Sequence, residues 1–482
     1  MIIVCIGRDR MDEQAMAGLS GATVRSIAIR FAGEGSGEAP LTWSQADHWR
    51  ANLAAGRAAT FGGNFAWPAG TTVEFMAETL RFMLSRHQAL RTRLRFDADG
   101  WPYQCCASEG EIQLQVVEAG TADPAALAQE LERQFHWQDF DFENEWPIRM
   151  AVVTVRGEVT HQVVVYLHLA LDGGGTDALL ADLAARDPVT GEPAGPITAI
   201  QPLELARRQA EPAAQRQSLA AMRHLERVLR SVEPKLLGEP RWDGPPSYRP
   251  IRYRTPATLL AVKRIVAEQG VPASSVLAAL YAVALGRLLG RGDIWTMMLV
   301  SNRFRPGLTG TVGLIVQSSP FQLDVAGVSL ATAVARARAS MLHTYKNAYY
   351  DGRHRDEVLD RVQRERGVLI DTSCYFNDRR VERPPDGLPP ADDDRLRAAL
   401  AESAWVPEPG RPPRNVLQVN VLDAPVVDPA DPPGAIDLHI TWDPRYFELT
   451  EIQRLATGIE SVAVETAISP DAPTGIPPRT SE

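Results

Sequence analysis

The chain has 482 residues, a formal net charge of −10 at pH 7 and 45% hydrophobic residues. This length accommodates two domains, or two halves of one, and the negative charge gives no indication of a nucleic-acid surface. Neither a membrane helix nor a signal peptide is expected, because the apolar runs are too short, so we expect a cytoplasmic protein. The four cysteines have neither the number nor the spacing of a zinc site or a disulfide framework; they are Cys5, Cys105, Cys106 and Cys374.

Hydrophobic periodicity predicts the elements of the first part of the chain. A strand is expected at Val24–Phe31, followed by a Gly-rich turn at Glu34–Pro40. Thr42 or Ser44 can cap a helix that runs through Trp49. An amphipathic helix is predicted at Thr72–His87, with its apolar side chains at Val73, Met76, Leu80, Met83 and Leu84.

The second part of the chain begins after a Pro- and Gly-rich loop at 187–202 and a helical stretch at Leu203–Val232. A helix is expected at Thr258–Gly270, and a second at Ser274–Gly290 is apolar nearly all round, which predicts that it is buried. The remaining expected elements are strands at Ile294–Val300, Phe321–Val325, Val416–Leu422 and Ile436–Trp442, helices at Val328–Tyr350 and Thr450–Ala467, an exposed excursion at Pro384–Pro413 and a disordered tail from Ser469.

A strand–turn–helix at Val163–Arg186 carries the main candidate site. Its apolar run ends at Leu169, three glycines (Gly173–Gly175) allow a tight turn with room for a ligand, and Thr176 is placed to cap the helix. His168 and Asp172 lie where the strand gives way to the loop, a common location for catalytic groups. The alternative is that His168 is a satisfied core histidine.

The pattern His168-x-x-x-Asp172-Gly173 resembles the H-H-x-x-x-D-G signature of the condensation domains of nonribosomal peptide synthetases, and of the wider superfamily of carrier- or coenzyme-A-dependent acyltransferases. His168 stands at the second, catalytic histidine of that signature. Leu167 replaces the first histidine, which is mostly structural in the family. Other stretches resemble family motifs in the same order; they are Pro40–Gln45, Arg86–Leu94, Phe140–Arg149 and Ser301–Ile315.

The resemblance also implies roles for residues outside the signature. Arg91 is expected to pair with Asp172 and so to hold the histidine loop, although a solvated arginine is the alternative. The Ser301–Ile315 stretch is expected to form the floor of the site. The substrate-binding candidates are Gly174, Asn302, Gln317 and Ser318.

The fold implied by the resemblance is an α/β sandwich, a pseudo-dimer of two chloramphenicol acetyltransferase-like halves that form a V with a central tunnel. The N-terminal half with the signature corresponds to 22–186 and the inter-half loop and helix to 187–250. The C-terminal half corresponds to 251–468 and the disordered tail to 469–482.

The implied activity is that of a free-standing condensation enzyme of secondary metabolism. It would transfer an acyl or aminoacyl group from the phosphopantetheine thioester of an acyl or peptidyl carrier protein to a small-molecule amine or alcohol. His168 would take the proton of the nucleophile or hold it by a hydrogen bond, with Asp172 and Gly173 completing the signature. The Gly173–Gly175 amides are candidates for binding the oxyanion. We expect no bound cofactor or metal, no nucleic-acid or membrane partner, and a monomer.

Two alternatives remain open from the sequence. A condensation-like domain without catalysis could dock on carrier proteins and recruit another enzyme, and Leu167 favours this reading. A coenzyme A-dependent O-acyltransferase would instead be active without any carrier protein.

Overall fold

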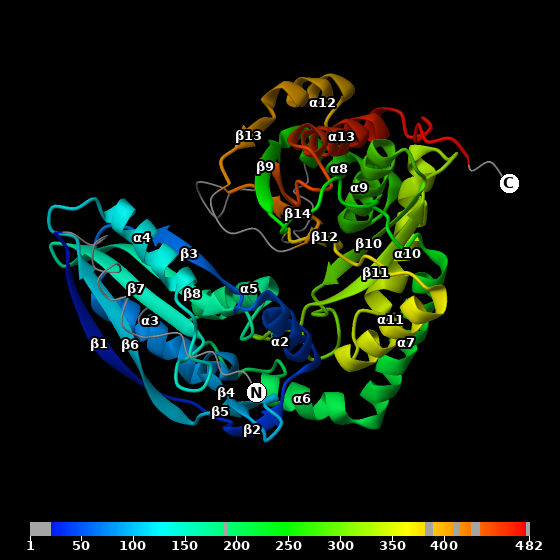
Figure 1. Cartoon of the computed structure of the whole chain (residues 1–482). Helices are drawn as coiled ribbons and strands as arrows, with labels where there is room; N and C mark the ends of the chain where they lie inside the picture. The colour runs from blue at the N-terminus through cyan, green and yellow to red at the C-terminus, as the bar shows by residue number, and fades with distance from the viewer. Residues whose placement is uncertain (1–20, 188–189, 381–388, 409–414, 426–433, 479–482) are drawn as a thin grey trace. The chain divides into compact units, whose positions relative to one another are not determined.

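The computed structural model describes residues 21–478 apart from 188–189, 381–388, 409–414 and 426–433 (Figure 1). Backbone contacts divide the described residues into two units. Unit 1 contains the chain up to Ala214 together with Ser301–Val316, and unit 2 contains Gln215–Val300 and the chain from Gln317 onward. The expected second half starts at Ile251, whereas unit 2 already starts at Gln215 and excludes Ser301–Val316.

Unit 1 is built on a five-stranded sheet that is covered on both faces. Successive residues of a strand point to opposite faces. Met150 and Val152 therefore pack with helix α3, while Ala151 and Val153 pack with helix α4. The strands, in spatial order, are β1 (Thr23–Ala32), β6 (Glu109–Glu118), β7 (Ile148–Val155), β8 (Glu158–Leu167) and β3 (Thr60–Ala66), all antiparallel neighbours except the parallel pair β6–β7.

The other elements of unit 1 surround this sheet. A second sheet contains β2 (Gly37–Pro40), β5 (Pro102–Cys106) and β4 (Thr92–Phe96). The helices are α2 (Trp43–Ala55), α3 (Val73–Arg86), η1 (Gln88–Arg91), α4 (Pro124–Trp137), α5 (Gly173–Ala184) and α6 (Pro202–Ala210).

Unit 2 is built on a seven-stranded mixed sheet. Helix α9 (Ala273–Leu289) is buried along most of its length and contacts α8, α10, α13 and the sheet, as Figure 1 shows. The strands, in spatial order, are β11 (Gln317–Asp324), β10 (Asp293–Val300), β12 (Cys374–Asp378), β14 (Leu417–Asp423), β15 (Ile436–Trp442), β9 (Arg249–Thr255) and β13 (Ala404–Val406). The other helices are α7 (Pro212–Ser231), α8 (Pro256–Gln269), α10 (Leu330–Lys346), α11 (Gly352–Arg366), α12 (Asp393–Ala399), η2 (Leu400–Glu402) and α13 (Leu449–Ile468).

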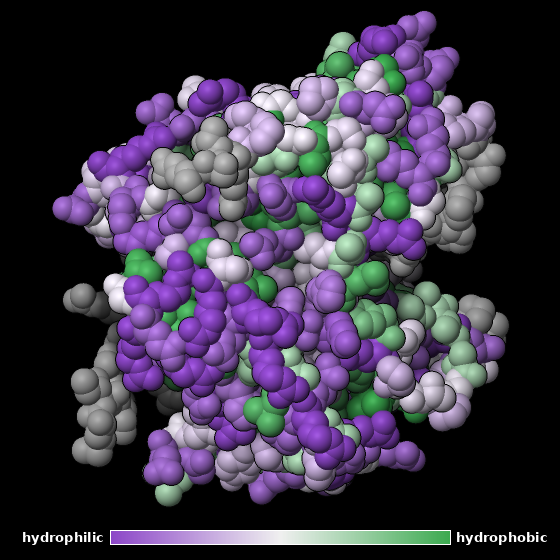
Figure 2. Space-filling model, turned by 90° about the vertical axis from the view of Figure 1, so that its right-hand side faces the viewer, coloured by the Kyte–Doolittle hydropathy of each residue, from purple (hydrophilic) through white to green (hydrophobic). Residues whose placement is uncertain are grey.

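The predicted α/β class is confirmed by both units, whereas the V arrangement and the tunnel stay predictions. The strand at Ile436–Trp442, the helix at Thr72–His87 and the buried helix at Ser274–Gly290 are confirmed to within about two residues. Within the described residues, no single helix is long and apolar enough to cross a membrane; the consecutive helices α8 and α9 pass the same test only as a pair bent by 117°. Most side chains on the face shown in Figure 2 are hydrophilic.

The predicted helical stretch Leu203–Val232 is confirmed, and Pro212 divides it into two helices, α6 and α7. Helix α11 forms at a charged stretch for which we predicted no element. The prediction of an exposed excursion at Pro384–Pro413 is wrong for its described part. The described part of the expected excursion Pro384–Pro413 contains α12, whose Leu396 is fully buried, and β13, which joins the sheet of unit 2.

The prediction of a disordered tail from Ser469 is also wrong for the described residues. The N–H of Gly327 donates to the carbonyl of Ile476 at 2.8 Å, and the N–H of Thr474 donates to that of Val328 at 2.9 Å. Ile476 is buried, and its side chain packs so closely on Gly286 that a Cβ there would lie 2.7 Å from Ile476 Cδ1. Backbone pairing and one apolar anchor therefore order this segment despite its prolines.

We predict that Ile476→Ala lowers the free energy of unfolding by about 2–4 kcal/mol, because it empties a packed apolar site. Chemical denaturation of the purified protein measures this change. Pro477→Ala, at an exposed neighbouring position, is the matched control and should stay within about 0.5 kcal/mol of the parent. Equal stability of both variants and the parent would show that the segment does not dock.

Candidate active site

The candidate site begins where β8 ends. His168–Ala170 form a turn after Leu167, and Asp172 then caps α5 by accepting the N–H of Gly175 on Oδ1 at 2.8 Å. The prediction that Thr176 caps the helix is wrong, because Asp172 offers a carboxylate in extended backbone four residues earlier. The three glycines consequently form the first turn of α5 rather than a separate loop.

The carboxylate of Asp172 is buried and fully engaged. Its Oδ2 accepts the backbone N–H groups of Ile315 and Val316, both at 2.9 Å. Its Oδ1 lies 2.8 Å from Nη1 of Arg303, which forms an ion pair with it. Burial of a carboxylate is costly unless hydrogen bonds and an opposite charge compensate it, and here both are present. Asp172 therefore ties the His168 loop to the Ser301–Val316 segment.

The predicted pairing of Arg91 with Asp172 is wrong. Arg91 is fully buried at the end of η1, directly before β4, and its guanidinium donates to the backbone carbonyls of Glu34, Gly35 and Ala107. Its Nη1 also lies 3.2 Å from Sγ of Cys106. These contacts give Arg91 a supporting role at the start of β2 and the end of β5, while Arg303 supplies the positive charge at Asp172.

Arg303 also explains two of the glycines. Its Nη2 donates to the carbonyls of Thr311 and Gly313, each at 3.0 Å. A Cβ on Gly174 would lie 2.8 Å from Arg303 Nη1, and a Cβ on Gly175 would lie 2.7 Å from the carbonyl oxygen of Gly313. The expectation that the glycines leave room for a ligand is therefore wrong at these two positions, because protein atoms occupy the space.

The Gly175 amide is equally committed, since its N–H caps the helix on Asp172. The expectation that this amide binds an oxyanion is therefore wrong. The roles of Gly173 and Gly174 toward a substrate stay predictions. Gly173 opens α5 directly after the capping residue.

His168 is half-buried and held by its backbone and by its ring. Its N–H donates to the carbonyl of Ala59 at 2.9 Å, and its Nδ1 donates to the carbonyl of Leu171 at 3.1 Å. A carbonyl oxygen can only accept, so in the neutral ring the proton is on Nδ1 and Nε2 carries the lone pair. The ring also packs edge-on against Phe61, with centroids 4.9 Å apart. This arrangement presents Nε2 as a proton acceptor.

A second histidine that sequence reasoning missed lies beside His168. The ring centroid of His48, on α2, is 4.5 Å from that of His168. Burial and the nearby His168 hold the pKa of His48 well below its usual range. The only sequence signal for His48 is its helical spacing. It follows the buried Gln45 by three residues and precedes the buried Asn52 by four, which places it on the same face of the helix.

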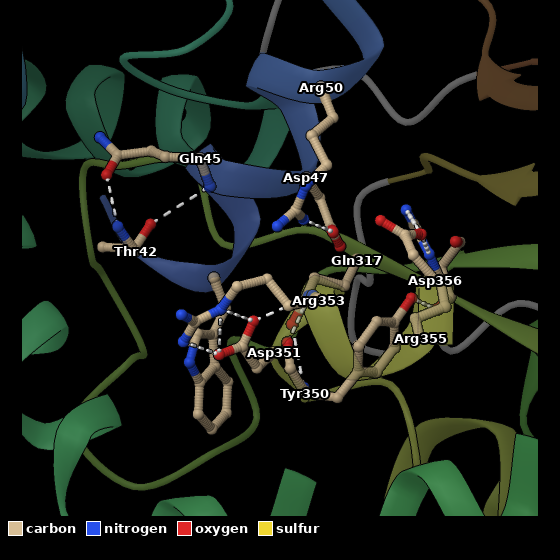
Figure 3. Close-up of polar contacts among 12 residues, drawn as sticks. Thr42, Gln45, Asp47, Arg50, Gln317, Tyr350, Asp351, Arg353, Arg355 and Asp356 are labelled. Atoms are coloured by element: carbon tan, nitrogen blue, oxygen red, sulfur yellow. Dashed lines mark hydrogen bonds and ion pairs between the residues drawn. The ribbon is translucent and has the colours of Figure 1, made fainter. Parts of the chain in front are cut away.

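Helix α2 is firmly anchored. Thr42 and Gln45 form a reciprocal capping box, shown in Figure 3, in which each side chain accepts the backbone N–H of the other residue. The amide of Gln45 also donates to Gln104 at 3.2 Å and to the carbonyl of Leu169 at 3.4 Å, one residue from the His168 position. These bonds fix α2 relative to the His168 loop.

The remaining predicted residues have structural partners. Asn302 is buried with φ of +59°, and its side chain donates to the carbonyl of Ile315 at 3.1 Å while accepting from Arg305 at 3.0 Å. Asn tolerates this left-handed conformation better than most residues. Asn302 thus shapes the segment that reaches Asp172, and its contact with a substrate stays a prediction.

Gln317 and Ser318 belong to unit 2, at the start of β11. Figure 3 shows Gln317 beside Tyr350, whose carbonyl accepts from the Gln317 amide at 2.8 Å. The Tyr350 hydroxyl donates to the carbonyl of Ser318 at 2.6 Å. Ser318 also lines a small hollow with Met222 and Met297. Substrate binding by Gln317 and Ser318 stays a prediction.

With this geometry in place, the comparison with known families is decisive. The family model named "Condensation domain" matches residues 37–383. The chain belongs to the condensation-domain family. The correspondence of His168, Asp172 and Gly173 to the signature of that family stays a prediction. Leu167, which we placed at the first histidine of the signature, packs in an apolar cluster with Leu41, Trp49 and Leu169.

Three similar proteins illustrate the relationship. The chain is 26% identical over 294 residues to the isonitrile lipopeptide synthase of Mycobacterium tuberculosis, a match that covers 57% of the chain and only 12% of that synthase. The first condensation domain of the calcium-dependent antibiotic synthetase, in complex with a substrate analogue, has a TM-score of 0.66 at 17% identity and covers 92% of this chain and 98% of its own. The complex of the X-domain and OxyB from teicoplanin biosynthesis has a TM-score of 0.65 at 15% identity, with coverage of 94% and 98%. These two structural likenesses show the fold.

A charged cluster supports the helix that follows the signature. Asp182 on α5 accepts from Arg86 at 2.7 Å and lies 3.0 Å from Nε2 of His87, at the end of α3. Burial alone would raise the pKa of the Asp182 carboxyl, but the hydrogen bonds of His87 and Arg86 outweigh burial and hold its pKa below its usual range. The cluster joins the C-terminal turn of α5 to the end of α3.

We predict that Asp182→Asn destabilises the protein at pH 7 and that this difference shrinks in acid. A carboxyl whose pKa is lower in the folded state contributes stability above its unfolded pKa of about 3.9, and loses it as pH falls further toward the folded value. Unfolding midpoints of parent and variant between about pH 3 and 7 measure this. Glu78→Gln, in an exposed ion pair on α3, is the control. A difference that is constant over this range would contradict the assignment.

A double-mutant cycle tests the partner of Asp172. We expect Asp172→Asn and Arg303→Met to couple by about 1–3 kcal/mol in unfolding free energy, because they share one buried ion pair. Asp172→Asn and Arg91→Met should be additive within about 0.5 kcal/mol. Coupling to Arg91 instead of Arg303 would restore the pairing expected from the sequence.

Proposed function

We propose that this condensation-domain protein transfers an acyl or aminoacyl group from a carrier-protein thioester to an amine or alcohol. The observation that carries the proposal is the hydrogen bond from His168 Nδ1 to the carbonyl of Leu171. It commits Nδ1 as the donor, so the lone pair of the neutral ring is on Nε2, and we propose that this lone pair accepts the proton of the attacking nucleophile. An imidazole suits this task near neutral pH.

The reaction follows from this arrangement. As the nucleophile attacks the thioester carbon, its proton passes to His168 Nε2. A new C–N or C–O bond forms, the C–S bond breaks, and the proton passes on to the sulfur that leaves as the thiol of the phosphopantetheine arm. The thioester is already activated, so holding both substrates in position supplies much of the acceleration. Nothing in these steps calls for a covalent enzyme intermediate.

Asp172 supports this chemistry indirectly. Its carboxylate oxygens are engaged by Gly175, Ile315, Val316 and Arg303, so Asp172 is a positioning residue that fixes the loop bearing His168. A loop fixed by several bonds holds the imidazole within the narrow tolerance that acyl transfer requires.

Two observations favour the docking alternative. The likeness to the X-domain extends over most of the chain, and that domain is seen in a complex with OxyB. Leu167, in the apolar cluster, also departs from the family signature. A non-catalytic role would leave the orientation of the His168 ring without a purpose.

The test is a product assay by mass spectrometry with the chain alone. Acyl thioesters are offered on a carrier protein, and separately on coenzyme A, with a pool of amines and alcohols. We expect carrier-dependent product, and about 10²–10⁴-fold less of it with His168→Ala. His161→Ala is the matched control, because His161 lies on the same strand near its other end.

Each other outcome has a clear meaning. Equal product from parent and His168→Ala would contradict the role of His168. Product from coenzyme A alone would favour the O-acyltransferase alternative. Carrier binding without product would favour the docking alternative.

A further inference from the structure

His48 lies beside His168, although no sequence motif assigns it to the site. Its ring lies against that of His168, with centroids 4.5 Å apart and planes inclined by 43°. His48 is not part of the His168-x-x-x-Asp172-Gly173 pattern, and it lies on a different element, α2. Two imidazoles from separate elements therefore meet at one place in unit 1.

The Nε2 atom of His48 is buried, and among the residues that the structure describes no group forms a hydrogen bond with it. Leaving a buried polar atom without a partner is costly, so such atoms are rare and call for a functional explanation. A substrate group that binds beside His168 would give Nε2 the missing partner.

The protonation state of the His48 ring determines which substrate groups can form a hydrogen bond with its Nε2. Burial and the neighbouring His168 keep the pKa of His48 well below its usual range, so the ring is neutral at neutral pH. A neutral imidazole has one nitrogen that donates and one that accepts. In the tautomer with the proton on Nδ1, which is part of the proposal below, His48 Nε2 is the acceptor.

We propose, building on the acyl transfer proposed above, that His48 and His168 together hold a primary amine as the acyl acceptor. A neutral primary amine has two N–H bonds and one lone pair. One N–H donates to His168 Nε2 and the other to His48 Nε2, which leaves the lone pair directed at the thioester carbon. His48 is then a second residue in contact with the substrate.

The step is balanced without any further reagent. The amine nitrogen forms the C–N bond, the thioester C–S bond breaks, and one amine proton passes to His168 Nε2 and then to the departing sulfur. The second N–H stays on the nitrogen, held by His48, and becomes the N–H of the amide product. His48 therefore undergoes no net change in protonation.

An alcohol fits this site less well. Its single O–H donates to His168, and nothing is left to donate to His48 Nε2. A site that is built to hydrogen-bond a substrate group disfavours an analogue that lacks it, since a buried protein atom then stays unpaired. The pair of histidines consequently selects amide over ester formation.

The main test compares acceptors in the mass-spectrometric assay. The pool contains matched pairs, each a primary amine and the alcohol with the same carbon skeleton, with acyl groups on a carrier protein. We expect the parent to form amides. His48→Phe keeps an aromatic ring beside His168 but removes both nitrogens, so we expect about 10- to 100-fold less amide and ester formation changed by less than about threefold.

Two further variants guard against a loss of folding. His48→Gln places an amide oxygen near the position of Nε2, and we expect it to restore amide formation to within about tenfold of the parent. His161→Phe makes the same change at a half-buried histidine of β8, paired with Ala66 and away from the site, and should leave activity unchanged. Thermal unfolding of each variant confirms that it is folded.

A second readout does not depend on turnover. Long-range ¹H–¹⁵N correlation spectra of the parent at pH 7 should show His48 neutral, with its proton on Nδ1 and none on Nε2. A proton on Nε2, or a charged ring, would overturn the proposal.

The outcomes distinguish the role proposed for His48 from the acyl transfer itself. Amide formation that is unchanged in His48→Phe, or ester as the main product, overturns the role of His48 and leaves the acyl transfer standing. Absence of any product from the parent contradicts the acyl transfer itself, and the role of His48 falls with it.

Discussion

The site depends above all on the buried carboxylate of Asp172. One oxygen caps α5 through Gly175 and faces the guanidinium of Arg303, and the other accepts two consecutive amides, Ile315 and Val316. A buried charge of this kind is stable only when all of these partners are in place. The carboxylate of Asp172 therefore fixes the start of α5 and the loop that carries His168. It also fixes the segment around Ile315, which lies more than 140 residues further along the chain.

This constraint sets the chemistry of the loop before any substrate binds. Because the chain turns between Leu167 and Asp172, the carbonyl of Leu171 comes back to the His168 ring and fixes its tautomer. Leu167, one residue earlier, turns into the apolar cluster with Trp49 and Leu169, where a histidine would be poorly accommodated. At the position where we predicted the first histidine of the signature, the chain therefore has an apolar side chain that packs in a cluster.

Sequence reasoning located the signature and the strand before it, because an apolar run followed by His168, Asp172 and glycines is a strong local pattern. It failed where the answer depends on distant residues. Arg91 and Arg303 are equally plausible partners on paper, and only the fold shows that Arg91 is used by the carbonyls of Glu34 and Ala107. His48 gave no local signal beyond helical spacing, and the ordered segment around Ile476 was hidden by its prolines.

The central claim is that His168 moves a proton during acyl transfer, and the carrier protein itself reports on it most directly. Intact mass spectrometry of an acyl-loaded carrier follows the loss of the acyl group with time, in the presence of the chain and the acceptor pool. The account predicts unloading that needs both an acceptor and His168, and that falls about 10²–10⁴-fold with His168→Ala. Unloading at the same rate with His168→Ala, or none with the parent, would contradict it.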